Sequence, residues 1–293
     1  MRWPDALAGW PHAECSRRIL CAPHRWHIQE MGHGPVLLFL HGAGGASHSW
    51  RDVMPELARS FRCIAIDLPG HGLTQLGARN RSGLQATSQD VLALCRQENW
   101  PVAAVIGHSA GGAVALRMAQ IAPDRFHHVI GINPALGNFK GLAGLLFPAM
   151  AKVLAATPFT ADLFSRSASK PDRLKALLKS TGSQIDAKGE QLYAQLVADR
   201  DHVDGTLMMM AQWSLDAVAS DLGKTNAEVL FIAGAQDKTV PPSVAQDAAK
   251  RLPRAEVQVW ADLGHLLHEE APVRVAGAIQ SWLKEKGLLV QQA

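Results

Sequence analysis

The stretch that decides the fold is Gly107-His108-Ser109-Ala110-Gly111. It follows the apolar run 102–106 and precedes the helix-compatible run 112–119. A Gly-x-Ser-x-Gly sequence between a strand and a helix is typical of a nucleophile elbow, a turn so sharp that its neighbours must be small. Glycine at positions 107 and 111 removes the side chains that would collide there. We therefore expect the Ser109 hydroxyl to stand at the carboxyl edge of a sheet, where it can attack a substrate.

Apolar runs and helical patterns alternate on both sides of the elbow. Runs of mostly apolar residues predict strands at 36–40, 61–66, 102–106, 128–132, 229–233 and 257–260, and the unbroken apolar run 36–40 is typical of a strand covered on both faces. A half-exposed strand is expected at 25–30, and helices at 49–60, 84–99 and 272–286. The segment 136–222 is helical in pattern and has no convincing buried strand. This order predicts an α/β fold with a mostly parallel central sheet flanked by helices. Its core comprises 1–135 and 223–293, and 136–222 is an inserted helical lid.

Composition excludes several classes of protein. The chain has 293 residues, 47% of them hydrophobic and 19% charged, so it can bury a sizeable core. Its formal charge of +3 is mild, and no run of Lys and Arg indicates binding to nucleic acid. The amino terminus lacks a signal-peptide core, and prolines and a lysine interrupt the longest apolar stretch, 141–159. We expect a cytoplasmic protein with no transmembrane segment, and contact of the lid with a membrane surface stays open.

The cysteines do not indicate a metal site. Cys15, Cys21, Cys63 and Cys95 have no metal-ligand spacing, and no cluster of His, Cys and Asp has one either. We therefore predict no metal and no cofactor, and a reducing compartment.

Two polar residues follow strands near the carboxyl end of the chain. Asp237 comes after the strand 229–233, and His265 comes after the strand 257–260. A serine hydroxyl needs a base to activate it, and that base needs a third group to orient it. The carboxyl ends of parallel strands meet at one edge of a sheet, and the order Ser, Asp, His is typical of this architecture. The sequence thus predicts Ser109 as nucleophile, His265 as base and Asp237 as its orienting acid.

An oxyanion formed by that attack needs hydrogen-bond donors. We expect the backbone N–H of Ala110, directly after the nucleophile, to be one donor. The other should come from the loop His41-Gly42-Ala43-Gly44-Gly45, with Ala43 favoured over Gly44.

Other polar residues compete for these roles. His41 and His71 are interpreted as loop residues that brace the backbone, and Asp67 lies on the wrong side of Ser109 to be the acid. His268 is expected in a supporting layer or at the surface.

Several motifs together resemble the α/β-hydrolase superfamily over about residues 25–283: His41 to Gly45, Asp67-Leu68-Pro69-Gly70-His71-Gly72, the serine elbow, Gly234-Ala235-Gln236-Asp237 and Gly264-His265. A narrower similarity rests on Trp50-Arg51-Asp52, the lid segments 182–186 and 209–213, and residues 263–270. These are similar to the α/β-hydrolase-type magnesium-chelatase accessory proteins of bacteriochlorophyll biosynthesis. The resemblance implies a role near magnesium insertion into protoporphyrin and an association with magnesium chelatase.

The lid carries groups suited to a flat apolar ligand, such as a tetrapyrrole or another apolar ester. Phe147, Met209 and Trp213, with His108 beside the nucleophile, are the candidate substrate-binding residues. The same residues at helical spacing also suit the lid's own core.

Three functions stay open on this sequence. The first is a serine hydrolase acting on an ester or related acyl bond. The second is a porphyrin-binding or chelatase-assisting protein without turnover. The third is a cofactor-free haloperoxidase or a C–C bond hydrolase that uses the same triad.

Overall fold

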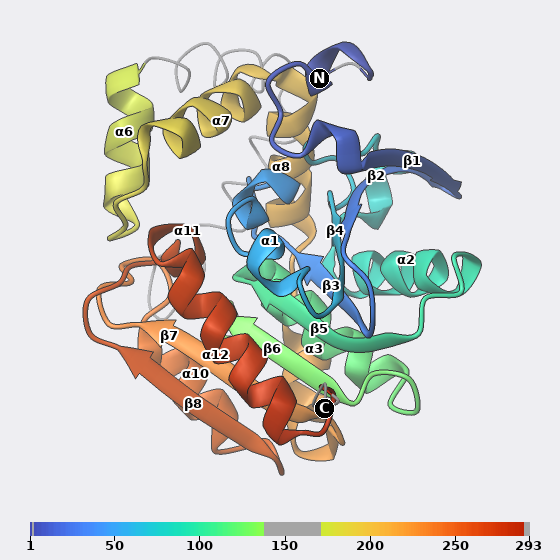
Figure 1. Cartoon of the computed structure of the whole chain (residues 1–293), viewed down its shortest axis with the longest axis vertical. Coiled ribbons are helices and arrows are strands. Elements are labelled where there is room, and N and C mark those ends of the chain that lie inside the picture. Colours follow the sequence, from blue (N-terminus) through green and yellow to red (C-terminus); the bar gives the residue numbers. More distant parts are fainter. Residues whose placement is uncertain (2, 138–170, 290–293) are drawn as a thin grey trace.

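The computed structural model describes residues 1, 3–137 and 171–289. Within these residues one sheet of eight strands forms the centre, in the order β1-β2-β4-β3-β5-β6-β7-β8 (Figure 1). The strands are β1 Ser16–Cys21, β2 His24–Met31, β3 Val36–Leu40, β4 Arg62–Ile66, β5 Val102–His108, β6 His128–Ile132, β7 Glu228–Gly234 and β8 Ala255–Trp260. β2 pairs antiparallel with β1 and with β4, and the pairs from β4 through β8 are parallel. The predicted α/β class with a mostly parallel sheet is confirmed.

Helices cover both faces of the sheet. They are α1 Met54–Leu57, α2 Leu84–Gln97, α3 Ala110–Ile121, α6 Pro171–Ser180, α7 Ala187–Ala198, α8 Arg200–Gln212, α9 Asp216–Asp221, α10 Pro242–Ala249, α11 Leu267–Glu270 and α12 Pro272–Glu285. In Figure 1 the red α12 crosses one face of the sheet, and α6, α7 and α8 stand together at the upper end of the molecule.

The apolar strands are buried on both faces because each face has its own core. Along β3, Leu38 and Leu40 belong to the cluster that includes residues of α2, α3 and α10. Leu37 and Phe39 point the other way, into the cluster that includes residues of α1 and α12. This alternation explains why the strand reads as an unbroken apolar run in the sequence.

The described part of 136–222 consists of helices α6 to α9 and the loops between them, placed between β6 and β7. This matches the predicted helical insertion, and its division into a separate lid stays a prediction. Residues 138–170, which include Phe147, lie outside the described residues.

The structure differs from the predicted elements in several places, and the short helix α11 was also not predicted. The expected helix 49–60 is broken into a 3₁₀ turn, Ser47–Trp50, and the short helix α1. Pro55 lies in the first turn of α1, the position where its missing N–H costs nothing, so a new helix begins there. The edge strand β1 and helix α10 were not predicted, because a half-exposed strand and a short helix carry weak apolar patterns.

Candidate active site

Ser109 lies in a sharp turn between β5 and α3. Its backbone has φ 49 and ψ −115, a left-handed conformation that is uncommon for a residue with a side chain. Its N–H donates to the Ile132 carbonyl (2.9 Å) and its own carbonyl accepts from the Gly112 N–H (3.0 Å). An added Cβ at Gly107 would collide with the Gly111 carbonyl, and one at Gly111 with the Leu40 carbonyl. The two glycines of the motif are therefore required by close backbone contacts, as the sequence predicts.

His265 and Asp237 form a buried pair. The ring Nδ1 lies 2.7 Å from Asp237 Oδ2, and only 6% of each residue's surface is exposed. The other carboxylate oxygen accepts from the N–H groups of Thr239 (2.7 Å) and Val240 (2.8 Å). Because both oxygens are hydrogen-bonded, the carboxylate cannot rotate away from the ring. It therefore fixes the orientation of the His265 ring, with Nδ1 toward Asp237.

Ser109 and His265 lie on neighbouring segments that are joined through His108. The His108 Nε2–H donates to the His265 carbonyl (2.9 Å), and the two rings lie 4.7 Å apart between centroids. No hydrogen bond between the Ser109 hydroxyl and His265 occurs in the described part of the chain. Catalytic hydrogen bonds are often long in the absence of substrate and shorten when it binds.

The loop after β3 lies directly against the nucleophile. A Cβ added at Gly42 would be 3.1 Å from Ser109 Cβ and 2.8 Å from His108 Nδ1. The N–H groups of Ala43 and Ala110 have no acceptor among the described residues. Two free amide donors beside a serine are what an oxyanion hole requires.

His41 holds this loop in place. Its Nδ1–H donates to the Gly42 carbonyl, and its Nε2 accepts from the Leu68 N–H, both at 2.8 Å. Burial lowers the pKa of His41, so the neutral ring can donate on one side and accept on the other. The predicted bracing role of His41 is confirmed, and His71 likewise faces a backbone carbonyl, that of Pro69 (3.2 Å).

The helical insertion contacts the same loop through α8. His202 Nε2–H donates to the Gly44 carbonyl (3.2 Å), and its Nδ1 accepts from the Gly72 N–H (3.0 Å). Burial lowers the pKa of His202 to about 4, so this bridge uses a neutral ring at neutral pH.

The Asp67 carboxylate is occupied by hydrogen bonds to two loops and to His27. Its two oxygens accept from the N–H groups of Ser47 (2.6 Å) and Leu73 (2.8 Å), and it pairs with His27 Nδ1 (2.7 Å). Burial alone would raise the pKa of Asp67, but His27 and the backbone donors hold it below its usual range. Asp67 is therefore a buried anion that fixes loops, which agrees with its rejection as the catalytic acid.

The predicted substrate-binding residues differ in how deeply they are buried. Met209, on α8, is 1% exposed and belongs to the hydrophobic core, and Trp213 packs partly exposed against that core. His108 is buried against His265 and His268, with ring centroids 4.7 and 4.4 Å away. For Met209 the core interpretation therefore fits the structure, and substrate contact by Trp213 stays a prediction.

An ion network that was not predicted from the sequence connects α7 of the helical insertion to α11, which follows His265. Arg51 donates to Glu269 (2.5 Å) and to Asp186 (2.9 Å), which caps α7. Tyr193 of α7 donates to the second oxygen of Glu269 (2.8 Å). Burial raises the pKa of Glu269 to about 7, against the lowering effect of Arg51. Arg51 and Glu269 lie in two of the segments on which the narrower resemblance rests. That resemblance was the one sign in the sequence that these residues matter.

Of the two places expected for His268, the supporting layer fits the structure, since its ring lies 4.4 Å from that of His108 between centroids. It is fully buried, and its ring packs on Trp50 with centroids 4.6 Å apart, so it does not lie at the surface. Burial lowers its pKa to about 3.

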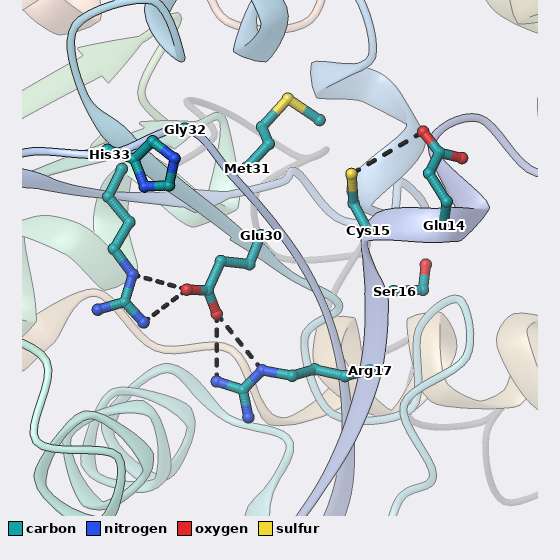
Figure 2. Close-up of a pocket in the computed structure, with 9 residues that line it drawn as sticks. Glu14, Cys15, Ser16, Arg17, Glu30, Met31, Gly32 and His33 are labelled. Carbon is teal, nitrogen blue, oxygen red and sulfur yellow. Dashed lines mark hydrogen bonds and ion pairs between the residues drawn. The ribbon is translucent and has the colours of Figure 1, made fainter.

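A separate pocket lies at β1 and β2, away from every predicted site residue (Figure 2). Glu30 occupies its centre and pairs with Arg17 (3.3 Å) and with Arg62. Both arginines of the pocket are thus paired with the same glutamate.

Over the described ranges, no group of His, Cys, Asp and Glu could hold a metal ion. No helix in those ranges is long and apolar enough to cross a membrane.

The fold and the serine elbow define a class of protein, and sequence comparison agrees. The chain belongs to the alpha/beta hydrolase fold family, whose model matches residues 35–272. A magnesium-chelatase 30 kDa subunit from Rhodobacter capsulatus is 45% identical over 284 residues, covering 96% of this chain and 99% of that protein. A 2-hydroxymuconate semialdehyde hydrolase from a Pseudomonas species is 27% identical over 93% of this chain and 95% of that protein. A thermophilic esterase from Thermogutta terrifontis has the same fold, with a TM-score of 0.74 at 21% identity over 94% of this chain and 99% of that one. Both resemblances drawn from the motifs are thus confirmed.

Proposed function

We propose that this protein is a serine hydrolase that cleaves an ester or related acyl bond. The observation that carries the proposal is the convergence of three features at one sheet edge. These are the strained Ser109, the His265–Asp237 pair at 2.7 Å and the free amides of Ala43 and Ala110.

Each group has one task in this reaction. His265 Nε2 takes the proton of the Ser109 hydroxyl as the oxygen attacks the acyl carbon. Asp237 keeps Nδ1 protonated and stabilises the imidazolium, while the two amides bind the oxyanion. His265 then returns the proton to the leaving group, and water repeats the sequence on the acyl-enzyme.

We also propose a place for the protein in tetrapyrrole metabolism, beside magnesium chelatase. The support is the 45% identity to a protein named as a magnesium-chelatase subunit, with nearly full coverage of both chains. In that setting the substrate would be an apolar, tetrapyrrole-sized ester.

The hydrolase is tested with a fluorophosphonate probe, which reacts with activated serines. We expect the wild type to be labelled, and Ser109→Ala and His265→Ala to lose labelling by at least about 10³-fold, because either change removes the activated nucleophile.

Ser16→Ala is the matched control. Ser16 Oγ lies 3.0 Å from His27 Nε2, and His27 pairs with Asp67, so the chain holds a second Ser–His–Asp sequence of contacts. Ser16 lies in the extended strand β1, and its oxygen already accepts from the Gln29 amide (3.1 Å). Labelling should therefore survive its removal. A folded wild type that the probe does not label, or labelling that only Ser16→Ala abolishes, would contradict the proposal.

A second function is a chelatase-assisting protein that binds without turnover. It is favoured by the missing hydrogen bond between Ser109 and His265 over the described residues and by the relative's name as a subunit. In a strain that depends on this protein for pigment, Ser109→Ala should then support wild-type synthesis. Under the hydrolase proposal the same variant fails.

A further inference from the structure

We propose that Asn133 is a positioning residue that holds the segments of all three triad members in register. This inference rests on the proposed hydrolase function. Asn133 directly follows β6, is 1% exposed, and bonds through its side chain to backbone groups.

The side chain of Asn133 joins the loops that carry the acid and the base. Its Nδ2 donates to the carbonyls of Gly264 (2.9 Å) and His265 (2.8 Å). Its Oδ1 accepts from the N–H of Gly234 (2.8 Å), the last residue of β7, three positions before Asp237. One amide thus connects the end of β7 to the loop after β8.

The backbone on either side of Asn133 holds the nucleophile. The Ser109 N–H donates to the Ile132 carbonyl (2.9 Å), and the Ala135 N–H donates to the Ser109 carbonyl (3.0 Å). The four residues 132–135 therefore bond to the serine from both sides and, through Asn133, to the other two segments.

Only an asparagine satisfies all of these contacts. Two carbonyls require a donor and one N–H requires an acceptor, which a carboxylate or a hydroxyl cannot supply together in this geometry. Asn133 also has φ 42, and asparagine tolerates this left-handed backbone better than most residues. The three buried hydrogen bonds of the side chain offset the cost of this backbone conformation.

The His265 carbonyl has one other hydrogen-bond donor besides Asn133. His108 Nε2–H also donates to the His265 carbonyl, so loss of Asn133 leaves that carbonyl with a single donor. We therefore expect misplacement of the His265 ring rather than loss of the fold.

The test separates reactivity from binding and from stability. In Asn133→Asp the Gly234 contact survives, while both donations are lost and a negative charge faces two carbonyls. Asn133→Ala removes all three bonds. With the fluorophosphonate probe we expect the maximal inactivation rate to fall about 10- to 100-fold in both variants, with unchanged half-saturation, because a small misplacement of the base costs this much.

The control is Gln120→Ala on α3. The Gln120 amide also donates two bonds, to the Val218 carbonyl (3.2 Å) and to Thr225 Oγ1 (3.1 Å), away from the triad. This variant should lose thermal stability and keep the wild-type inactivation rate. A folded Asn133→Asp or Asn133→Ala protein that reacts at the wild-type rate would overturn the inference.

A spectroscopic readout distinguishes this failure from failure of the hydrolase itself. The His265 Nδ1 proton, shared with Asp237, should give a downfield proton NMR signal, assigned by its loss in His265→Ala. In Asn133→Asp that signal should shift or broaden, whether or not the probe reacts. If the probe does not label the wild type but the signal shifts in Asn133→Asp, the proposed function is wrong and the positioning role stands. If the signal is unchanged in Asn133→Asp, the positioning role is wrong.

Discussion

Histidine–aspartate pairs are not rare in this chain, so the pair alone does not identify the catalytic residues. Within the described ranges His24 pairs with Asp90 at 3.0 Å, and His27 with Asp67 at 2.7 Å, as closely as His265 with Asp237. The three pairs differ in what lies around them. Of the three, the His265 pair is the one in contact with the elbow, through His108, the neighbour of the strained Ser109. The chemistry of each pair is decided by its neighbours.

This difference leads to a prediction for Asp237→Asn. The asparagine oxygen can still accept from the Thr239 and Val240 N–H groups, so the loop should fold. Its amide would face His265 Nδ1 and favour the wrong tautomer, and the rate of fluorophosphonate labelling should fall about 10⁴-fold.

The control is Asp90→Asn, which changes a buried pair of the same kind on α2. It should cost stability, because His24 and Arg81 both contact Asp90, and leave the labelling rate intact. Equal losses of rate in the two variants would show that labelling reports the fold and not the triad.

At the scale of elements, the strand–elbow–helix unit is the best-determined part of the molecule. Gly111 contacts the backbone of β3, so a methyl group there should force the elbow and that strand apart. We expect Gly111→Ala to lower the free energy of unfolding by about 1–3 kcal/mol. Urea unfolding measures this change.

Gly277 is the matched position on α12. A Cβ there meets nothing within 4 Å, and alanine is the better helix former by about 0.5–1 kcal/mol. Gly277→Ala should therefore stabilise the protein. Changes of the same sign in the two variants would contradict the packing argument.

The sequence predicted the elements whose signals are local. The strands read as runs of mostly apolar residues and the elbow reads as a motif, so β3 to β8 and Ser109 were placed correctly, although β8 is partly exposed. The Arg51–Glu269–Tyr193 network and the Asn133 contacts were not predicted. They join residues up to 218 positions apart, and nothing in a single sequence pairs such residues.

At the scale of the whole molecule, the unusual feature is the number of buried histidine side chains. Six of them are at most 4% exposed and have pKa values lowered mainly by burial: His41, His48, His71, His108, His202 and His268. They cluster around the elbow, the loop after β3 and the contact of α8 with that loop. The site is thus surrounded by neutral rings that stay neutral only while the fold excludes water.

This arrangement makes stability depend on pH. Above pH 6.5 the six histidines are neutral in both the folded and the unfolded chain. Below it the unfolded chain takes up protons that the folded chain does not, and each group lowers the free energy of unfolding by at most about 1.4 kcal/mol per pH unit, until the pH reaches the pKa of that group in the folded protein. Glu269 acts in the opposite sense between about pH 4.5 and 7, since its raised pKa lets the folded state bind the extra proton. Six groups outweigh one, so the free energy of unfolding should fall by several kcal/mol between pH 6.5 and 5.

Urea unfolding at a series of pH values measures this slope. His268→Phe retains a ring on Trp50 and removes one titrating group, so its slope should be smaller by about 1.4 kcal/mol per pH unit, whatever its stability at neutral pH. A wild-type stability that stays level from pH 7.5 to 5 would mean that these rings are protonated or hydrated in the folded protein. The neutral His202 ring argued for the contact between α8 and the loop after β3 would then be wrong as well.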